Sequence, residues 1–402
     1  MGETIKRCVC LLLAVVLCGV LTVAAAQAPR NSGDYRYVRL ADGTAEITGY
    51  TGRERALSVP ETLDGVPVTR IGARAFFMGE MTSIDLPDGL THIGSHAFEG
   101  CALLTRVDLP DSVGTLGEAA FLGCGALTAV RFPKGVRELP DEAFAWCGAL
   151  TDVFLPDGLN AIGDRAFLRC TSLTAMDIPD GTTALGNHAF DGCTSLLRMA
   201  LPDSLTEVGD NPFADCTSLM ELVVSLMHPT LTVCGGVLME EKRVIACPAA
   251  AGVTVCTVPE GIERIGEFAF AGCDSLMRVD LPDSVTDIGN GSFRGCTALA
   301  EIRLPDGLTA IGDGAMMNCT ALTAVEIPSG VTRIGFGAFN GCSALREAYI
   351  PDSVWEIGAL AFEGCPVTLT AGVGSAAQRY AQENEIAFAD REGRLFYPVV
   401  MP

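Results

Sequence analysis

The chain has 402 residues, of which 49% are hydrophobic but only 6% aromatic. A single hydrophobic core rarely extends over this length, and the shortage of aromatic residues favours many small, similar layers over a few large core anchors. The net charge of −22 argues against nucleic acid and anionic membrane surfaces as partners, because both would be repelled.

Residues 1–26 have the pattern of a secretory signal. Lys6 and Arg7 precede an apolar run from Cys8 to Val23, and three alanines then form a small-residue cleavage site before Gln27. An uncleaved membrane anchor is the alternative, because the apolar run is just long enough to cross a bilayer. No second run of that length follows. We therefore predict a secreted or cell-surface protein with no membrane span after removal of the signal.

The rest of the chain repeats itself every 23 residues, in two sets separated by an irregular stretch. Proline recurs at Pro87, Pro110, Pro133, Pro156, Pro179 and Pro202, and again at Pro259, Pro282, Pro305, Pro328 and Pro351. Cysteine recurs at Cys101, Cys124, Cys147, Cys170, Cys193 and Cys216, and again at Cys273, Cys296, Cys319, Cys342 and Cys365. Phenylalanine precedes each of these cysteines by three residues, except where Met316 replaces it. Such a period is typical of a solenoid, whose units bury their apolar faces by stacking on one another.

One unit, LAEIRLPDGLTAIGDGAMMNCTA from Leu299, indicates what each period builds. Its first apolar residues have the spacing of a short strand with one buried face, and the Pro-Asp-Gly sequence then turns the chain. A second short extended stretch ends at a glycine, and the Ala-Met-x-x-Cys segment has the spacing of one buried helical turn. We expect such coils to stack into a continuous core.

The common pattern LxxVxLPDSVxxIGxxAFxGCxxL, almost intact in LMRVDLPDSVTDIGNGSFRGCTAL from Leu276, resembles the BspA-type leucine-rich repeat of bacterial surface proteins. The resemblance spans about residues 34 to 388. It implies an α/β repeat solenoid, a right-handed array of 23-residue coils with short strands and short helical turns. It also implies adhesion or ligand binding at a cell surface, although the fold does not specify the ligand.

These patterns divide the chain into six segments. We expect a signal peptide at 1–26, an N-terminal hairpin cap at 27–58, a first repeat block at 59–221, an irregular insert at 222–257, a second repeat block at 258–366, and a C-terminal cap helix and tail at 367–402. Asp42 and Gly43 form a strong hairpin-turn pair, and Ser375 is a good N-cap for the terminal helix. Caps are expected because an open end would expose the core.

The cysteines favour packing over metal binding. No CxxC pair occurs, so we predict neither a zinc site nor another cofactor. The periodic cysteines occupy equivalent positions, and we interpret them as free, buried residues with weak S–H donors. Disulfides are the alternative. Because stacked equivalents point the same way, we expect any native bridge to involve Cys234, Cys247 or Cys256, which lie outside the period.

No catalytic site stands out. His96 and His188 occupy the same position in different coils and are interpreted as solvated, whereas a metal pair of His92 with His96 is less favoured. The GxGxxxG spacing at Gly289 recurs at Gly335, which indicates turn geometry rather than phosphate binding. Because no GxSxG elbow or other activated nucleophile is evident, we predict no catalytic residues and no enzyme activity.

The candidate binding site is therefore a surface. In each LxxVxLP strand, the residues on either side of the Val position should project away from the core and form two columns, whose identities vary more than those of the core. Aromatic and charged residues, which are enriched in binding hot spots, combine in two clusters: Arg131, Phe154 and Asp177, and Arg303, Glu326 and Tyr349.

We predict that this strand face binds a protein or glycan without catalysing a reaction. An ordinary solvated sheet face and a structural spacer or coat component without a specific ligand are the alternatives. The sequence does not define an oligomeric state.

Overall fold

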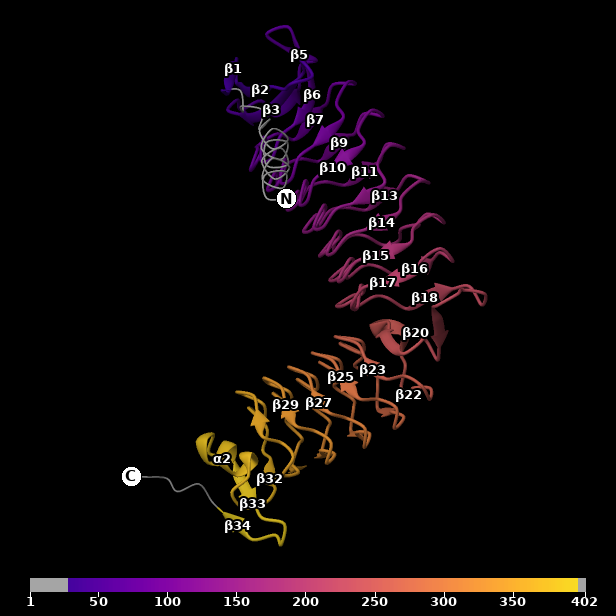
Figure 1. The fold of residues 1–402 in the computed structure, drawn as a ribbon, viewed down its shortest axis with the longest axis vertical. Coiled ribbons are helices and arrows are strands. Elements are labelled where there is room, and N and C mark those ends of the chain that lie inside the picture. The colour runs from indigo at the N-terminus through magenta and orange to yellow at the C-terminus, as the bar shows by residue number, and fades with distance from the viewer. Residues whose placement is uncertain (1–27, 397–402) are drawn as a thin grey trace, which may run out of the picture.

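The computed structural model describes residues 28–396, which form stacked coils along a curved arc (Figure 1). The expected signal peptide and the last residues of the tail lie outside this range. Within it, no helix is both long and apolar enough to cross a membrane.

Most regular coils contribute two short strands to parallel ladders. The LxxVxLP strands are β4 (Ala56–Ser58), β7 (Ser83–Asp85), β9 (Arg106–Asp108), β11 (Ala129–Arg131), β13 (Asp152–Phe154), β16 (Arg198–Leu201), β18 (Glu221–Val224), β22 (Val255–Thr257), β24 (Arg278–Asp280), β26 (Glu301–Ile302), β28 (Ala324–Glu326) and β30 (Glu347–Tyr349). The strands on the second side are β6 (Val66–Ile71), β8 (His92–Ile93), β10 (Thr115–Leu116), β12 (Glu138–Leu139), β14 (Ala161–Ile162), β15 (Ala184–Leu185), β17 (Glu207–Val208), β21 (Arg243–Ala246), β23 (Arg264–Ile265), β25 (Asp287–Ile288), β27 (Ala310–Ile311), β29 (Arg333–Ile334) and β31 (Glu356–Ile357). Ser83 pairs with Arg106, so equivalent residues of successive coils stack directly.

The expected helical turns are present as consecutive tight turns rather than as regular helix. The N–H of Cys101 donates to the carbonyl of Phe98 at 3.1 Å, three residues earlier. The N–H of Phe98 itself donates to the carbonyl of Ala120 in the next coil at 2.8 Å. Because alternate amides bond to the neighbouring coil, they are not free to form the i to i−4 bonds of an α-helix.

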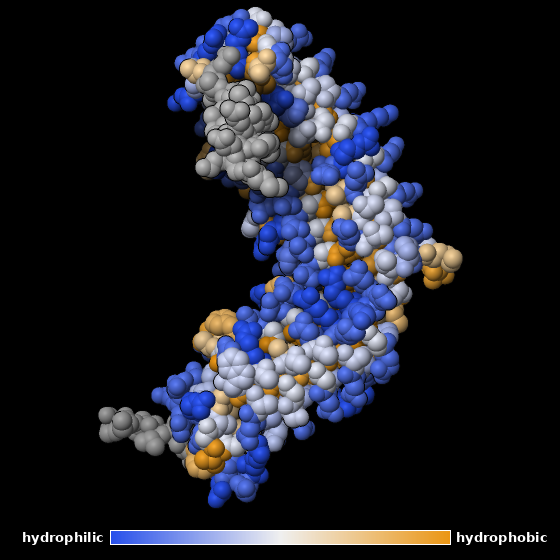
Figure 2. Space-filling model, in the orientation of Figure 1, coloured by the Kyte–Doolittle hydropathy of each residue, from blue (hydrophilic) through white to orange (hydrophobic). Residues whose placement is uncertain are grey.

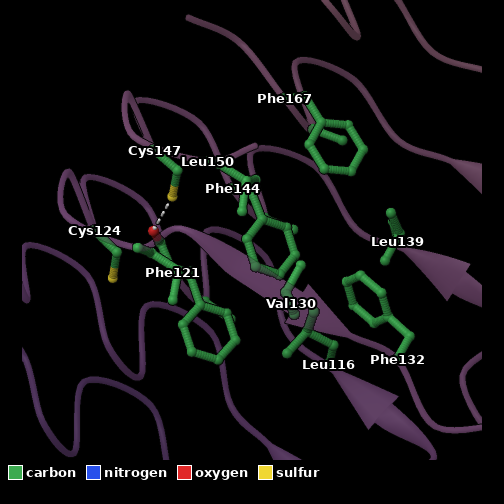
Figure 3. Packing of buried hydrophobic residues seen from close by; sticks show 14 of the residues in the cluster. Leu116, Phe121, Cys124, Val130, Phe132, Leu139, Phe144, Cys147, Leu150 and Phe167 are labelled. Atoms are coloured by element: carbon green, nitrogen blue, oxygen red, sulfur yellow. Dashed lines mark hydrogen bonds between the residues drawn. The ribbon is translucent and has the colours of Figure 1, made fainter. Parts of the chain in front are cut away.

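Phenylalanine and cysteine columns fill the interior of the array (Figure 3). The rings of Phe98 and Phe121 stack with centroids 5.1 Å apart and an interplanar angle of 9°. The periodic cysteines are buried from Cys101 to Cys342, and Cys365 in the last coil is half-buried. All cysteines in residues 28–396 are free thiols, including Cys234, Cys247 and Cys256. The interpretation of the periodic cysteines as free packing residues is confirmed.

The insert lies at the bend of the arc (Figure 1) and separates two hydrophobic cores. Its additional elements are β19 (Thr232–Cys234), β20 (Val237–Glu240) and the short 3₁₀ helix η1 (Ala249–Ala251). The antiparallel hairpin of β20 and β21 places Leu238 and Ile245 in the core of the first block. Val237, Met239 and Val244 belong to the core of the second block. Since successive residues of a strand face opposite sides, one hairpin covers both cores.

Additional elements close the two ends. They are β1 (Arg30–Ser32), β2 (Tyr35–Arg39), β3 (Ala45–Tyr50) and β5 (Thr62–Leu63) at the N-terminus, and β32 (Thr368–Thr370), α2 (Ala376–Glu383), β33 (Ala387–Ala389) and β34 (Leu395–Phe396) at the C-terminus. The antiparallel β2–β3 hairpin pairs with the first coil through β3 and β6. Helix α2 begins after Ser375, whose Oγ accepts a hydrogen bond from the N–H of Gln378, and buries Tyr380 against the last coil.

Candidate ligand-binding face

The two columns of the LxxVxLP strands project into solvent. In β9, Val107 is buried, whereas Arg106 and Asp108 on either side of it are exposed. This alternation follows from the pleat of a strand, in which successive side chains point to opposite faces. Parallel pairing without a register shift then places each exposed residue beside its equivalent in the next coil. The strand face is therefore a series of short parallel sheets with a similar backbone and many different exposed side chains.

Arg131 and Phe154 form a cation–π pair on this face. They are register partners on β11 and β13, and the guanidinium carbon of Arg131 lies 4.7 Å from the ring centroid of Phe154. The Phe154 side chain stays 49% exposed, so part of its ring is open to a ligand. Asp177 is exposed in the next coil, but residues 175–177 form no strand and the sheet is interrupted there. The structure thus joins two of the three predicted residues directly.

Arg303, Glu326 and Tyr349 line one groove, with a volume of about 700 Å³. Glu326 and Tyr349 are register partners on β28 and β30. The guanidinium of Arg303 lies 3.6 Å from a carboxylate oxygen of the exposed Asp283, which is its one ion pair among the described residues. All three predicted residues of the second cluster therefore meet in one concave site.

The groove also contains residues outside the predicted clusters. Glu301 and Glu347 come from the neighbouring column, Asp306 from a Pro-Asp-Gly turn and Thr370 from β32 in the C-terminal cap. Asp306 belongs to the recurring Pro-Asp-Gly turn, and Thr370 lies beyond the last regular period, so neither carries a sequence signal for binding. Carboxylates outnumber the single arginine, and Tyr349 adds a ring that is 37% exposed. These groups suit noncovalent binding of basic or hydroxylated ligands.

The interpretation of His188 as a solvated residue is wrong. Its side chain is only 15% exposed, and its Nδ1 lies 3.2 Å from an Asp191 carboxylate oxygen, without hydrogen-bond geometry. Its ring packs edge-on against Phe268, with centroids 5.7 Å apart. The insert brings these two coils together although they are far apart in the sequence.

Among residues 28–396, no group of three potential metal ligands is placed to hold an ion.

The stacked coils, parallel ladders and leucine-rich units define a leucine-rich-repeat solenoid. A profile of the BspA type leucine rich repeat region matches residues 69–196, 137–231 and 249–368, in six copies. The chain belongs to this family, as the sequence pattern predicts.

Solved structures support the same conclusion. The chain is similar to a leucine rich cell surface protein from Faecalibacterium prausnitzii A2-165, with 30% sequence identity, a TM-score of 0.71 and coverage of 89% of this chain and 98% of that chain. A leucine-rich repeat protein from Eubacterium ventriosum ATCC 27560 shares the fold at 22% identity, with a TM-score of 0.58 and coverage of 84% and 85%. The pneumococcal vaccine antigen PcpA does so at 16% identity, with a TM-score of 0.59 and coverage of 90% and 97%. A comparison with curated proteins finds no match.

Proposed function

We propose that the chain is a non-enzymatic extracellular or cell-surface module that binds a protein or glycan through its strand face. The observation that carries this proposal is the contrast between a nearly constant core and variable exposed columns in which aromatic and charged side chains meet. The secretory pattern of residues 1–26 and the similarity to a leucine rich cell surface protein support the location.

The two clusters offer different contacts to a partner. Phe154 presents a partly exposed ring already stacked on Arg131, which provides contact area at little entropic cost. The groove around Tyr349 carries mainly carboxylates, which favour a partner with basic side chains. A protein is accordingly the main form of the proposed partner, and a glycan with hydroxyls for these carboxylates is the second.

A structural spacer or coat component is the alternative function, because a long solenoid can separate two attachment points without binding a ligand. The two functions differ in what the strand face contributes. A binding module loses its partner when the clusters are removed, whereas a spacer does not depend on them.

The test immobilises the purified chain and measures binding of extracellular proteins and glycans at increasing concentration. The Phe154→Ala/Tyr349→Ala double variant is compared with Phe336→Ala, a matched control whose ring is similarly exposed, at 48%, but lies on the turn side. Saturable binding that only the double variant loses supports the proposal. Ordered self-assembly in sedimentation experiments without saturable binding supports the spacer. Binding that the double variant retains overturns the assignment of the strand face.

A further inference from the structure

The ladder of hydrogen bonds along the turn side is broken at the insert. In regular coils, the amide before the periodic cysteine donates to a carbonyl of the next coil, as Gly192 does to Ala214 and Gly272 to Arg294, both at 2.8 Å. Asp215 occupies this position in the last coil of the first block. Within residues 28–396, no hydrogen bond joins the N–H of Asp215 to the C=O of Ala271, its counterpart across the insert.

The break arises because the insert lacks the AFxGC turn. Cys247 donates its N–H to Ala269, but Pro248 and η1 then lead the chain away to pack on Leu219. The turns on either side consequently approach each other. The amide Nδ2 of Asn211 donates to the carbonyl of Phe268 at 2.6 Å across the gap.

A cavity of about 250 Å³ remains beside this contact, between residues of the two repeat blocks. The residues that line it include His188, Asp191, Asp215, Phe268, Arg294 and Asn318. On the face shown in Figure 2, hydrophilic residues gather where the two arms of the arc meet, and hydrophobic residues project from the outer edge of the bend. None of the residues that line the cavity belongs to the two strand-face clusters, so the cavity is a separate site.

The lining combines the aromatic ring of Phe268 with side chains that donate and side chains that accept hydrogen bonds. The Phe268 ring lies so close to Gly291 that a Cβ there would collide with it, and the edge of His188 contacts it from another side. Asp191 and Asp215 provide acceptors, Arg294 provides donors, and Asn318 provides both. Asp215 and Ala271, whose backbone groups do not bond to each other, also line the cavity.

A hydroxyl group matches this arrangement, because it donates and accepts at the same atom. Two carboxylates beside one guanidinium disfavour an anionic ligand. The volume lies just below the range of about 300–1,000 Å³ usual for drug-sized ligands, which limits the occupant to about one ring. We propose that the cavity binds one neutral sugar ring, either a free monosaccharide or the terminal residue of a glycan.

The test is a titration of the full chain with glucose, galactose, mannose and N-acetylglucosamine, followed by saturation-transfer NMR. At least one sugar is expected to bind saturably. Its affinity should fall about tenfold or more in Phe268→Ala and in the exposed variant Arg294→Ala. Phe336→Ala and the Phe154→Ala/Tyr349→Ala double variant should bind as the unmodified chain does, which separates this site from the strand face.

Two further ligands test whether the bound sugar must be neutral and whether it is a free monosaccharide or the terminal residue of a glycan. Glucuronic acid should bind more weakly than glucose, because it places a carboxylate beside Asp191 and Asp215. A disaccharide ending in the preferred sugar should bind at least as well if the site accepts glycan termini, and more weakly if it accepts only free monosaccharides. Absence of saturable binding by all four sugars, or binding that survives both Phe268→Ala and Arg294→Ala, would overturn the proposal.

Discussion

The Sγ of Cys147 donates a hydrogen bond to the carbonyl oxygen of Phe121 at 3.2 Å, which fastens one coil to the turn of the preceding coil (Figure 3). The same carbonyl accepts the N–H of Cys124 at 3.1 Å, so the thiol adds a side-chain bond to an existing turn. Burial raises the pKa of the Cys147 thiol to about 12. Because the thiolate is the reactive form, this position combines tight packing with chemical inertness.

Alkylation should therefore divide the cysteines into two groups. We expect iodoacetamide at mildly alkaline pH to label Cys234, which is exposed, and Cys365, which is half-buried and whose pKa is lowered by a hydrogen bond from the thiol of Cys342. The buried thiols from Cys101 to Cys342 should react only after denaturation. Peptide mapping by mass spectrometry measures this pattern. Native labelling of the buried column, or its isolation as disulfides, would contradict the packing role.

Excision of one whole coil should preserve the fold. Deleting 299–321 joins equivalent positions and places Phe293 next to Phe339, so both the core columns and the ladders stay in register. We expect cooperative thermal unfolding with a modestly lower Tm, because neighbouring coils supply most of the stabilising contacts. Deleting 299–310 alone should abolish folding, since it misaligns the columns. Circular dichroism melts compare the two deletions, and equal damage from both would argue against independent stacking of coils.

Acid should weaken the N-terminal cap through Asp64. Its carboxylate accepts hydrogen bonds from Ser32 Oγ at 2.8 Å and Tyr37 Oη at 2.9 Å, and these bonds lower its pKa. A carboxyl group with a lowered folded-state pKa stabilises the fold above the unfolded value of about 3.9, and this contribution is lost as the pH falls through the folded value.

The measurement is the Tm as a function of pH for the unmodified chain and for Asp64→Asn. The variant should be less stable at neutral pH and show a shallower loss between about pH 5 and 2, because its amide does not titrate in that range. If the Tm of the two proteins falls equally steeply as the pH is lowered, Asp64 does not contribute to this pH dependence.

The strand face should respond to single substitutions in a defined order. Phe154→Ala and Tyr349→Ala are each expected to cost about 1–3 kcal/mol of binding to a captured partner while leaving the Tm nearly unchanged. Arg131→Ala should cost less than Phe154→Ala, because it removes the cation but leaves the ring. Calorimetric titration measures these differences against Phe336→Ala. Weaker binding in Phe336→Ala alone would place the partner on the turn side instead.

Much of the fold follows from the spacing of a few residue types. The 23-residue recurrence of Pro, Phe and Cys predicts the coil, its buried columns and the exposure of alternate strand residues such as Arg106 and Asp108. The same alternation places Arg131 beside Phe154 one coil later. These relationships are local or repeat exactly one period apart, so the sequence alone contains them.

Contacts between residues on opposite sides of the insert cannot be predicted from the 23-residue repeat. Val237 and Leu238 are both buried because the hairpin separates two cores, a situation in which the usual alternation of apolar and polar residues disappears. His188 is covered by Phe268, which lies beyond the insert, and no repeat rule predicts that contact. The meeting of Thr370 with Tyr349 likewise depends on how the C-terminal cap continues the sheet.

The β20–β21 hairpin gives each arm of the arc a hydrophobic core of its own, and contacts such as that of Asn211 with Phe268 join the arms outside these cores. Neither core extends through it, so duplication or loss of a whole period in one arm leaves the packing of the other arm unchanged. A whole period added to one arm or removed from it therefore changes the length of that arm without changing the apolar contacts in the core of the other. Because the hairpin separates the two cores, the number of coils in one arm is independent of the packing inside the other.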